Sequence, residues 1–278
     1  MQDFRPADIA LRCVYRCLFA SFHRIHPSFV EELVRIFLGQ AVVDDSIEAF
    51  DGGLVEFEKD YSSYYTEPTI SPLHCWHYQY LKRAIDLVGS MMMIVAFAIP
   101  GLLIAAAIVL SSRGPVFYRE ERIGRGGKPF RIWKFRSMHR DAPRLDRVKV
   151  RQQGGVVLEW RMCKQRRDPR ITAVGGFLRR WSLDEVPQLL NVLRGEMSLV
   201  GPRPIVESET SLYGDLLTYY LAATPGLSGA WQVSGRSEID YDDRARLDAL
   251  YVSLWSMKTD LGILFLTIPA VLSRIGAY

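Results

Sequence analysis

One long uncharged stretch constrains this chain more than any other feature of its sequence. From Leu87 to Ser112, 26 consecutive residues carry no charged side chain. A helix needs only about 20 apolar residues to cross a hydrocarbon core roughly 30 Å thick. Pro100-Gly101 lies near the centre of the stretch, and proline inside a helix removes a backbone donor and clashes with the preceding turn. We therefore expect two helical halves of about 20 Å each, broken at Pro100.

Three arrangements fit this broken stretch: a kinked helix that spans a bilayer, a re-entrant hairpin that enters and leaves by one face, and a buried helical hairpin of a soluble core. Basic residues flank both ends, with Lys82 and Arg83 before the stretch and Arg113 and Arg119 after it. Basic residues next to a membrane segment prefer the cytoplasmic side. The sequence therefore favours the re-entrant form.

The positive charge is concentrated in one part of the chain. The net charge is only +4, but residues 113–203 contain 22 Lys and Arg against 9 Asp and Glu. Arginine suits phosphate recognition because its guanidinium can hold two oxygens at once. The partner of this region could be a nucleotide, a lipid phosphate, an anionic membrane surface or a nucleic acid.

We divide the chain into three parts. Residues 1–75 form an acidic N-terminal extension with short amphipathic helices and a linker. No secretory signal is evident there, so we expect the catalytic part to stay in the cytoplasm. Residues 76–112 hold the broken apolar helix, and residues 113–278 form the catalytic domain. The expected fold class is α+β: a re-entrant membrane helix hairpin plus a small cytoplasmic α/β catalytic domain with interfacial amphipathic helices.

Local patterns predict the elements of the third part. Pro115–Ile123 and Pro129–Met138 are rich in aromatic and β-branched residues around a glycine-rich turn, which indicates a β-hairpin. A helical region follows from about Gly175 to Arg194. Two further helices are expected between Asp242 and Ser273, and their apolar sides could face either a membrane surface or the protein core.

Asp184 and Glu185 are the leading candidates for chemistry. They are adjacent carboxylates bracketed by arginines, and adjacent residues on a helix point in different directions, so one could act as nucleophile and the other as base. A structural alternative is a capping box, with Ser182 as N-cap and Glu185 as its reciprocal partner. A solvated or membrane-facing basic surface would explain many of the arginines but not the Gly201–Pro204 turn, Gly-Pro-Arg-Pro, which fixes the backbone around Arg203 as a phosphate clamp requires.

Several ordered motifs resemble the monotopic phosphoglycosyl transferases, the bacterial polyprenyl-phosphate sugar-phosphate transferases. The resemblance covers about Tyr80 to Tyr278 and is closest to members that initiate exopolysaccharide synthesis. The motifs are KRAIDLVGS, GPVFYREERIGRGGKPFRIWKFRSM, DPRIT, SLDEVPQLLNVLRGEMSLVGPRP, TPGLSGAWQVSGRS and the final GAY. The family implies a re-entrant helix broken at a proline, which matches Pro100, although Ile99 replaces the serine that members often carry before it.

The resemblance implies a reaction. Galactose-1-phosphate or glucose-1-phosphate would pass from a UDP-sugar to undecaprenyl phosphate through a phosphosugar on Asp184, with release of UMP and with Mg²⁺ as cofactor. This would be the first membrane step of exopolysaccharide or other glycoconjugate synthesis, at the inner membrane. The implied residues are the catalytic Asp184 and Glu185, Asp184 also as metal ligand, the phosphate-binding Arg179, Arg203, Lys134 and Arg136, and the nucleotide-binding Arg236.

Two other functions would each explain part of the sequence. A membrane-associated, non-catalytic scaffold of a polysaccharide assembly system would be expected to lack part of the Asp184-Glu185 pair, and both residues are present. A nucleic-acid binder would explain the basic region but not the uncharged stretch, so we expect no nucleic-acid partner. The acidic extension could mediate formation of a homo-oligomer. Nothing in the sequence fixes the sugar.

Overall fold

The computed structural model describes residues 75–139, 170–234 and 241–273. The predicted N-terminal extension lies outside these ranges apart from Cys75, and so does Arg236. In the described ranges, helices are combined with two small two-stranded sheets, which confirms the α+β class. The helices are α4 (Arg83–Ala96), α5 (Ala98–Ser111), α7 (Ala173–Arg180), α8 (Leu189–Arg194), α9 (Leu217–Ala222), α10 (Ala230–Val233), α11 (Tyr241–Ser253) and α12 (Met257–Ser273).

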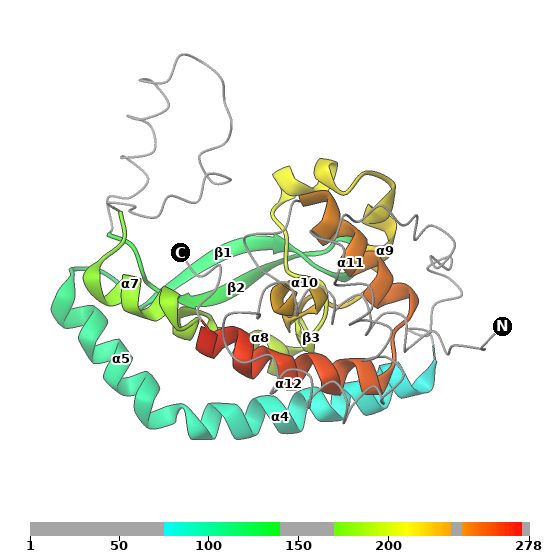
Figure 1. Cartoon of the computed structure of the whole chain (residues 1–278). Coiled ribbons are helices and arrows are strands. Elements are labelled where there is room, and N and C mark those ends of the chain that lie inside the picture. Colours follow the sequence, from blue (N-terminus) through cyan, green and yellow to red (C-terminus); the bar gives the residue numbers. More distant parts are fainter. Residues whose placement is uncertain (1–74, 140–169, 235–240, 274–278) are drawn as a thin grey trace, which may run out of the picture.

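The predicted β-hairpin is present in the middle of the molecule (Figure 1). Strand β1 (Phe117–Ile123) pairs antiparallel with β2 (Pro129–Phe135), each strand slightly shorter than predicted. Gly126 and Gly127 adopt positive φ angles of 67° and 76° in the turn, a region that glycine enters without steric cost. The second sheet joins β3 (Ser198–Val200) and β4 (Gly226–Ser228) in parallel.

The uncharged stretch forms a bent pair of helices, which runs along the lower edge of the molecule in Figure 1. No single described helix is long and apolar enough to cross a bilayer, whereas Tyr78–Ala96 and Ala98–Ser111 together reach that length with a 59° bend between them. The break lies at Phe97, not at Pro100 as predicted. Pro100 is the third residue of α5, where a missing N–H is tolerated, and the bond to Ala96 that it cannot make ends α4 one turn earlier.

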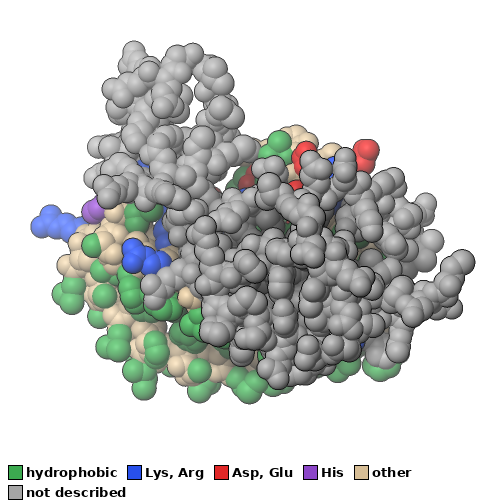
Figure 2. Space-filling model, viewed as in Figure 1, with side chains coloured by type: hydrophobic (Ala, Val, Ile, Leu, Met, Phe, Trp, Pro, Cys, Tyr) green, Lys and Arg blue, Asp and Glu red, His purple; other side chains and the backbone are tan. Residues whose placement is uncertain are grey.

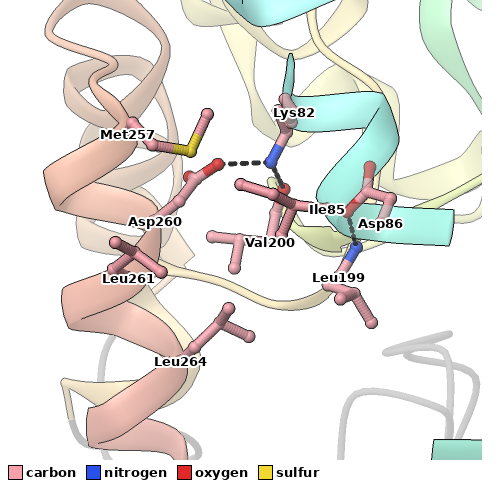
Figure 3. Close-up of a pocket in the computed structure, with 9 residues that line it drawn as sticks. All are labelled: Lys82, Ile85, Asp86, Leu199, Val200, Met257, Asp260, Leu261 and Leu264. Atoms are coloured by element: carbon pink, nitrogen blue, oxygen red, sulfur yellow. Dashed lines mark hydrogen bonds and ion pairs between the residues drawn. The ribbon is translucent and has the colours of Figure 1, made fainter. Parts of the chain in front are cut away.

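Charged residues at the start of this pair fasten it to the rest of the fold (Figure 3). Lys82, in the short π-helix η3 (His77–Lys82), donates to Asp260 of α12 at 2.6 Å and to the Val200 carbonyl at 2.8 Å. Asp86 accepts from the Leu199 N–H at 2.8 Å. The basic residues before the apolar stretch therefore have partners inside the protein, besides any effect of their charge on topology.

Arg136 fastens the other end of the pair. Its guanidinium donates to the Ser112 carbonyl at 2.7 Å and to the Ile108 carbonyl at 3.3 Å. The last carbonyls of a helix have no partner within the helix, so Arg136 satisfies acceptors at the end of α5. Arg136 is also a predicted phosphate ligand; its buried side chain makes this contact through Nη2, and the phosphate role stays a prediction.

The two predicted C-terminal helices are confirmed as α11 and α12. Both contribute to the main core, in which Trp255 meets Tyr78 edge-on at 4.9 Å between ring centroids. The outer side of α12 remains exposed through Leu261, Phe265, Ile268 and Leu272. The apolar sides of this region thus serve the core and also leave an apolar stripe on the surface.

Candidate active site

Asp184 and Glu185 lie on a short 3₁₀ helix, η5 (Leu183–Gln188), between α7 and α8. The predicted single helical region from Gly175 to Arg194 is interrupted here. Ser182 adopts a left-handed conformation with φ of 55°. The backbone changes direction there after α7, and the following residues turn toward the hairpin. The capping-box alternative is wrong, since the Ser182 side chain makes no cap hydrogen bond and the Glu185 carboxylate contacts other residues.

The Glu185 carboxylate is held by two cations. Its Oε1 atom lies 3.1 Å from Nζ of Lys134, on β2, and 3.3 Å from Nη2 of Arg203. The negative charge of Glu185 is the largest influence on Arg203 and raises the pKa of its guanidinium. Lys134 and Arg203 come from distant parts of the sequence, and both contact the same oxygen of Glu185. These two contacts fix the position of the carboxylate and do not involve its Oε2 atom.

The Asp184 side chain is buried, unlike that of its neighbour. Burial is the main reason that the pKa of Asp184 is raised above its usual value of 3.8, and the adjacent charge of Glu185 raises it further. Lys134 and Arg179 oppose this shift. A buried carboxylate that is coupled to a second acid is a frequent property of catalytic sites, and added positive charge at this position would favour its ionised form.

Arg179 approaches the site from the end of α7. Its Nε donates to the Ser137 hydroxyl at 3.0 Å. Its positive charge acts to lower the pKa of Asp184, so the guanidinium lies near the two carboxylates. The predicted residues Arg179, Lys134 and Arg203 are therefore brought together around Asp184 and Glu185. Arg136, directly before Ser137, points instead to the end of α5.

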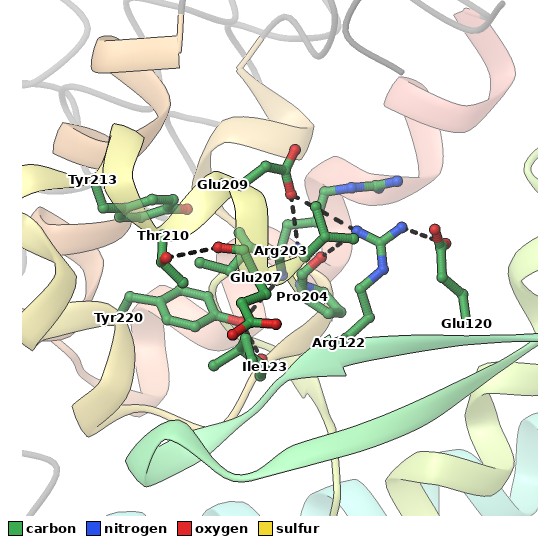
Figure 4. A network of polar contacts seen from close by, with 12 residues as sticks. Glu120, Arg122, Ile123, Arg203, Pro204, Glu207, Glu209, Thr210, Tyr213 and Tyr220 are labelled. Atoms are coloured by element: carbon green, nitrogen blue, oxygen red, sulfur yellow. Dashed lines mark hydrogen bonds and ion pairs between the residues drawn. The ribbon is translucent and has the colours of Figure 1, made fainter. Parts of the chain in front are cut away.

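The Gly-Pro-Arg-Pro turn is braced by the hairpin (Figure 4). Arg122 of β1 donates to the Pro204 carbonyl at 3.1 Å, and the Tyr220 hydroxyl bridges the Ile205 N–H and the Ile123 carbonyl. Gly201 is required at the start of the turn, because a Cβ atom there would lie 2.4 Å from the Thr224 carbonyl oxygen. The backbone on both sides of Arg203 is thus fixed by neighbouring elements.

Sequence reasoning missed the residues that brace and surround this turn. Arg122 and Tyr220 hold its backbone, while Arg203 and Arg244 both lie near the ring of Trp231. The alternation of β1 would have placed Arg122 on the same face as Tyr118 and Glu120, which is a usable signal. No comparable signal marks Arg244, because its contact with Trp231 depends on how α10 and α11 pack together.

A family model described as "Bacterial sugar transferase" matches residues 77–274. The undecaprenyl-phosphate galactose phosphotransferase of Salmonella typhimurium is 46% identical over 201 residues, which are 72% of this chain and 42% of that protein. The exopolysaccharide production protein ExoY of Rhizobium meliloti is 44% identical over 198 residues, 71% of this chain and 88% of that protein.

A third relative is named for a different sugar. The UDP-glucose:undecaprenyl-phosphate glucose-1-phosphate transferase of Escherichia coli is 40% identical over 196 residues, 68% of this chain and 39% of that protein. The chain thus spans less than half the length of the Salmonella and Escherichia proteins and most of the length of the Rhizobium protein. The matched part contains Asp184, Glu185 and the cations around them.

Proposed function

Because this chain belongs to the bacterial sugar transferase family, we propose that it transfers a sugar-1-phosphate from a UDP-sugar to undecaprenyl phosphate, with release of UMP. The observation that carries this proposal is the buried Asp184 beside Glu185, surrounded by Lys134, Arg179 and Arg203. The names of the relatives support this reaction class at the start of exopolysaccharide synthesis.

Asp184 acts as the nucleophile in this proposal. One of its carboxylate oxygens attacks the sugar-bearing phosphorus of the UDP-sugar, an O–P bond forms, and UMP leaves with the electron pair of the bond that breaks. A phosphate oxygen of undecaprenyl phosphate then attacks the same phosphorus and displaces the Asp184 carboxylate. A raised pKa supports the first step, because a more basic carboxylate is the stronger nucleophile once it is ionised.

The cations have a separate task. Both substrates are anionic, and so is the nucleophile, so the developing charge needs fixed positive groups. Arg179 and Arg203 would contact phosphate oxygens, and Lys134 keeps Glu185 in place beside Asp184. Glu185 is already positioned by two cations, and it would orient the acceptor phosphate or accept its proton in the second step. Arg236, outside the described residues, stays a prediction for the nucleotide.

Mg²⁺ fits the residues present. The described residues contain no group of three or more acidic, histidine or cysteine side chains that could enclose a metal. Mg²⁺ usually binds through one or two carboxylates together with substrate phosphates, and Asp184, whose pKa is raised, would be one such ligand. When bound, the ion would neutralise charge on the diphosphate of the donor.

We also propose that the bent helix pair enters the cytoplasmic leaflet of the inner membrane and returns, with the catalytic part in the cytoplasm. Large apolar side chains are exposed along both of its helices, and Figure 2 shows such side chains gathered at the lower edge of the molecule. They include Val88, Met92, Val95, Ile99, Leu102, Leu103 and Leu110. A surface of this kind would be costly in water and suits a lipid environment. The apolar stripe of α12 would lie against the same membrane surface.

The experiment is UMP release by purified protein with Mg²⁺, undecaprenyl phosphate and a set of UDP-sugars, with wild type beside Asp184→Asn. UDP-galactose and UDP-glucose come first, because the relatives are named for both sugars. We expect turnover of one or two donors by wild type and none by the variant. Lack of turnover with every donor, or full activity of Asp184→Asn, would favour the non-catalytic scaffold instead.

A further inference from the structure

Two guanidinium groups share the indole ring of Trp231 next to the carboxylate pair. Trp231 lies in α10 and is buried. The Cζ atom of Arg203 is 5.7 Å from its ring centroid, and that of Arg244, in α11, is 4.5 Å away. Cations at this distance are attracted to the face of an indole. Trp231 therefore brings an arginine of the Gly-Pro-Arg-Pro turn and an arginine of α11 to one place.

These two arginines differ in their partners. Arg203 lies 3.3 Å from Glu185, whereas Arg244 contacts only the rings of Trp231 and Tyr241 within the described part of the chain. Nε of Arg244 is buried and has no hydrogen-bond partner there. Burial lowers the pKa of Arg244, and the positive charge of Arg203 lowers it further, while Tyr241 and the negative charge of Glu209 oppose the shift without cancelling it. A partly buried cation beside another cation is unfavourable unless an anion accompanies it.

Asp248 does not supply that anion, although it follows Arg244 by one helical turn. Its Oδ2 accepts the hydroxyl of Tyr213 at 2.8 Å, and its Oδ1 has no partner among the described residues. Burial raises the pKa of Asp248 to about 8, so this carboxyl is mostly protonated at neutral pH. The side-chain amide of Gln232, next to Trp231, likewise has no partner there. Among the described residues, Nε of Arg244 and the side-chain amide of Gln232 therefore have no hydrogen-bond partner near the indole.

We propose that Arg244 and Arg203, both placed on Trp231, bind a phosphate group of a substrate. The proposal rests on the proposed function in one respect: both substrates of that reaction carry phosphates, the donor a diphosphate and the acceptor a monophosphate. A guanidinium can hold two phosphate oxygens at once. Arg203 is paired with Glu185, whereas Arg244 forms no ion pair with a described residue and lies against the rings of Trp231 and Tyr241, so its guanidinium is available to an anion. Arg244 is thereby a substrate-binding residue of the site.

The test measures binding and turnover on the same samples of full-length protein in detergent micelles. UDP and undecaprenyl phosphate are titrated separately, and UMP release is then recorded. The variants are Arg244→Gln, which removes the charge, and Arg244→Lys, which keeps the charge but loses the planar fork. Arg246→Gln is the matched control, since Arg246 lies on the same helix, is 47% exposed and pairs only with Asp243 in the described residues. Thermal unfolding of each variant checks that it is folded.

We expect Arg244→Gln to lower the affinity for one of the two ligands by about tenfold or more, which is the usual effect of losing a charge-assisted hydrogen bond. The affinity of Arg244→Lys should lie between those of Arg244→Gln and wild type. Weakening of UDP alone assigns the donor diphosphate, and weakening of undecaprenyl phosphate alone assigns the acceptor. Equal affinities of Arg244→Gln and Arg246→Gln for both ligands would overturn the proposal. If Arg244→Gln does not fold, the same comparison with Arg244→Lys decides. Absence of UMP release by wild type would refute the proposed function while leaving the binding comparison intact.

Discussion

The buried ion pair between Lys82 and Asp260 gives a quantitative prediction about stability. The two side chains are only 5% and 6% exposed, and Nζ lies 2.6 Å from Oδ2. Asp260 also accepts the Tyr251 hydroxyl at 2.7 Å. Asp260→Asn leaves the ammonium group with neutral acceptors in place of the carboxylate, the new amide oxygen and the Val200 carbonyl at 2.8 Å. Removing one partner of a buried pair costs about 3–5 kcal/mol, so we expect unfolding to be easier by that amount.

The assay is thermal unfolding in detergent micelles, followed by tryptophan fluorescence. A loss of this size lowers the melting temperature by roughly 6–20 °C for a domain of about 200 residues. The double variant Lys82→Met/Asp260→Leu removes both charges and should recover part of the loss; the recovery is incomplete because buried Asp86 then lacks the Lys82 charge that lowers its pKa. Lys258→Ala, at an exposed position of the same helix, is the control and should change stability by about 0.5 kcal/mol or less. If Asp260→Asn and Lys258→Ala have the same melting temperature, the predicted contribution of the Lys82–Asp260 pair to stability is refuted.

Three further predictions concern the turn and the core behind it. Arg122→Gln removes the hydrogen bond to the Pro204 carbonyl and should lower kcat/KM by about tenfold through a less fixed Arg203, with partial recovery in Arg122→Lys; unchanged kinetics would contradict the bracing role. Gly201→Ala places a Cβ atom against the Thr224 carbonyl and should lower the melting temperature sharply, whereas Gly214→Ala, with open space around it, should cost less. The pKa of Asp248 is raised to about 8, so the folded state binds this proton more tightly than the unfolded state, and stability falls as pH rises from about 4 to 8. Asp248→Asn cannot ionise, so relative to wild type it should gain stability as pH rises from about 4 to 8 and keep that gain above pH 8; parallel pH curves would exclude this assignment.

The hairpin and the C-terminal helices could be predicted because local patterns determine them. The aromatic and β-branched residues on both sides of the glycine-rich turn form β1 and β2, and the segment after Asp242 forms α11 and α12. The break of the apolar stretch was predicted three residues too late. The steric effect of Pro100 acts on the turn before it, so the chain bends at Phe97. A rule that assigns the break to the proline itself misses this displacement.

The site was predictable in its residue types but not in its pairings. The resemblance to the family pointed to Lys134, Arg179 and Arg203, and all three lie around the carboxylates. The same resemblance gave Arg136 a phosphate role, which stays a prediction, and nothing in the sequence indicates its contact with the last carbonyls of α5. Arg244 was missed for a related reason: its significance depends on a charge balance among residues that only the folded chain brings together.

The end of strand β2 contacts both the carboxylate pair and the end of the apolar helix pair through residues only two positions apart. Lys134 contacts Glu185, and Arg136, two residues later, contacts the last carbonyls of α5. One extra residue in α5 would turn those carbonyls by about 100° and advance them by about 1.5 Å, out of register with Arg136. The length of α5 is therefore set by the geometry of the site, and a chimera that exchanges this helix for a longer one would have to change the strand as well.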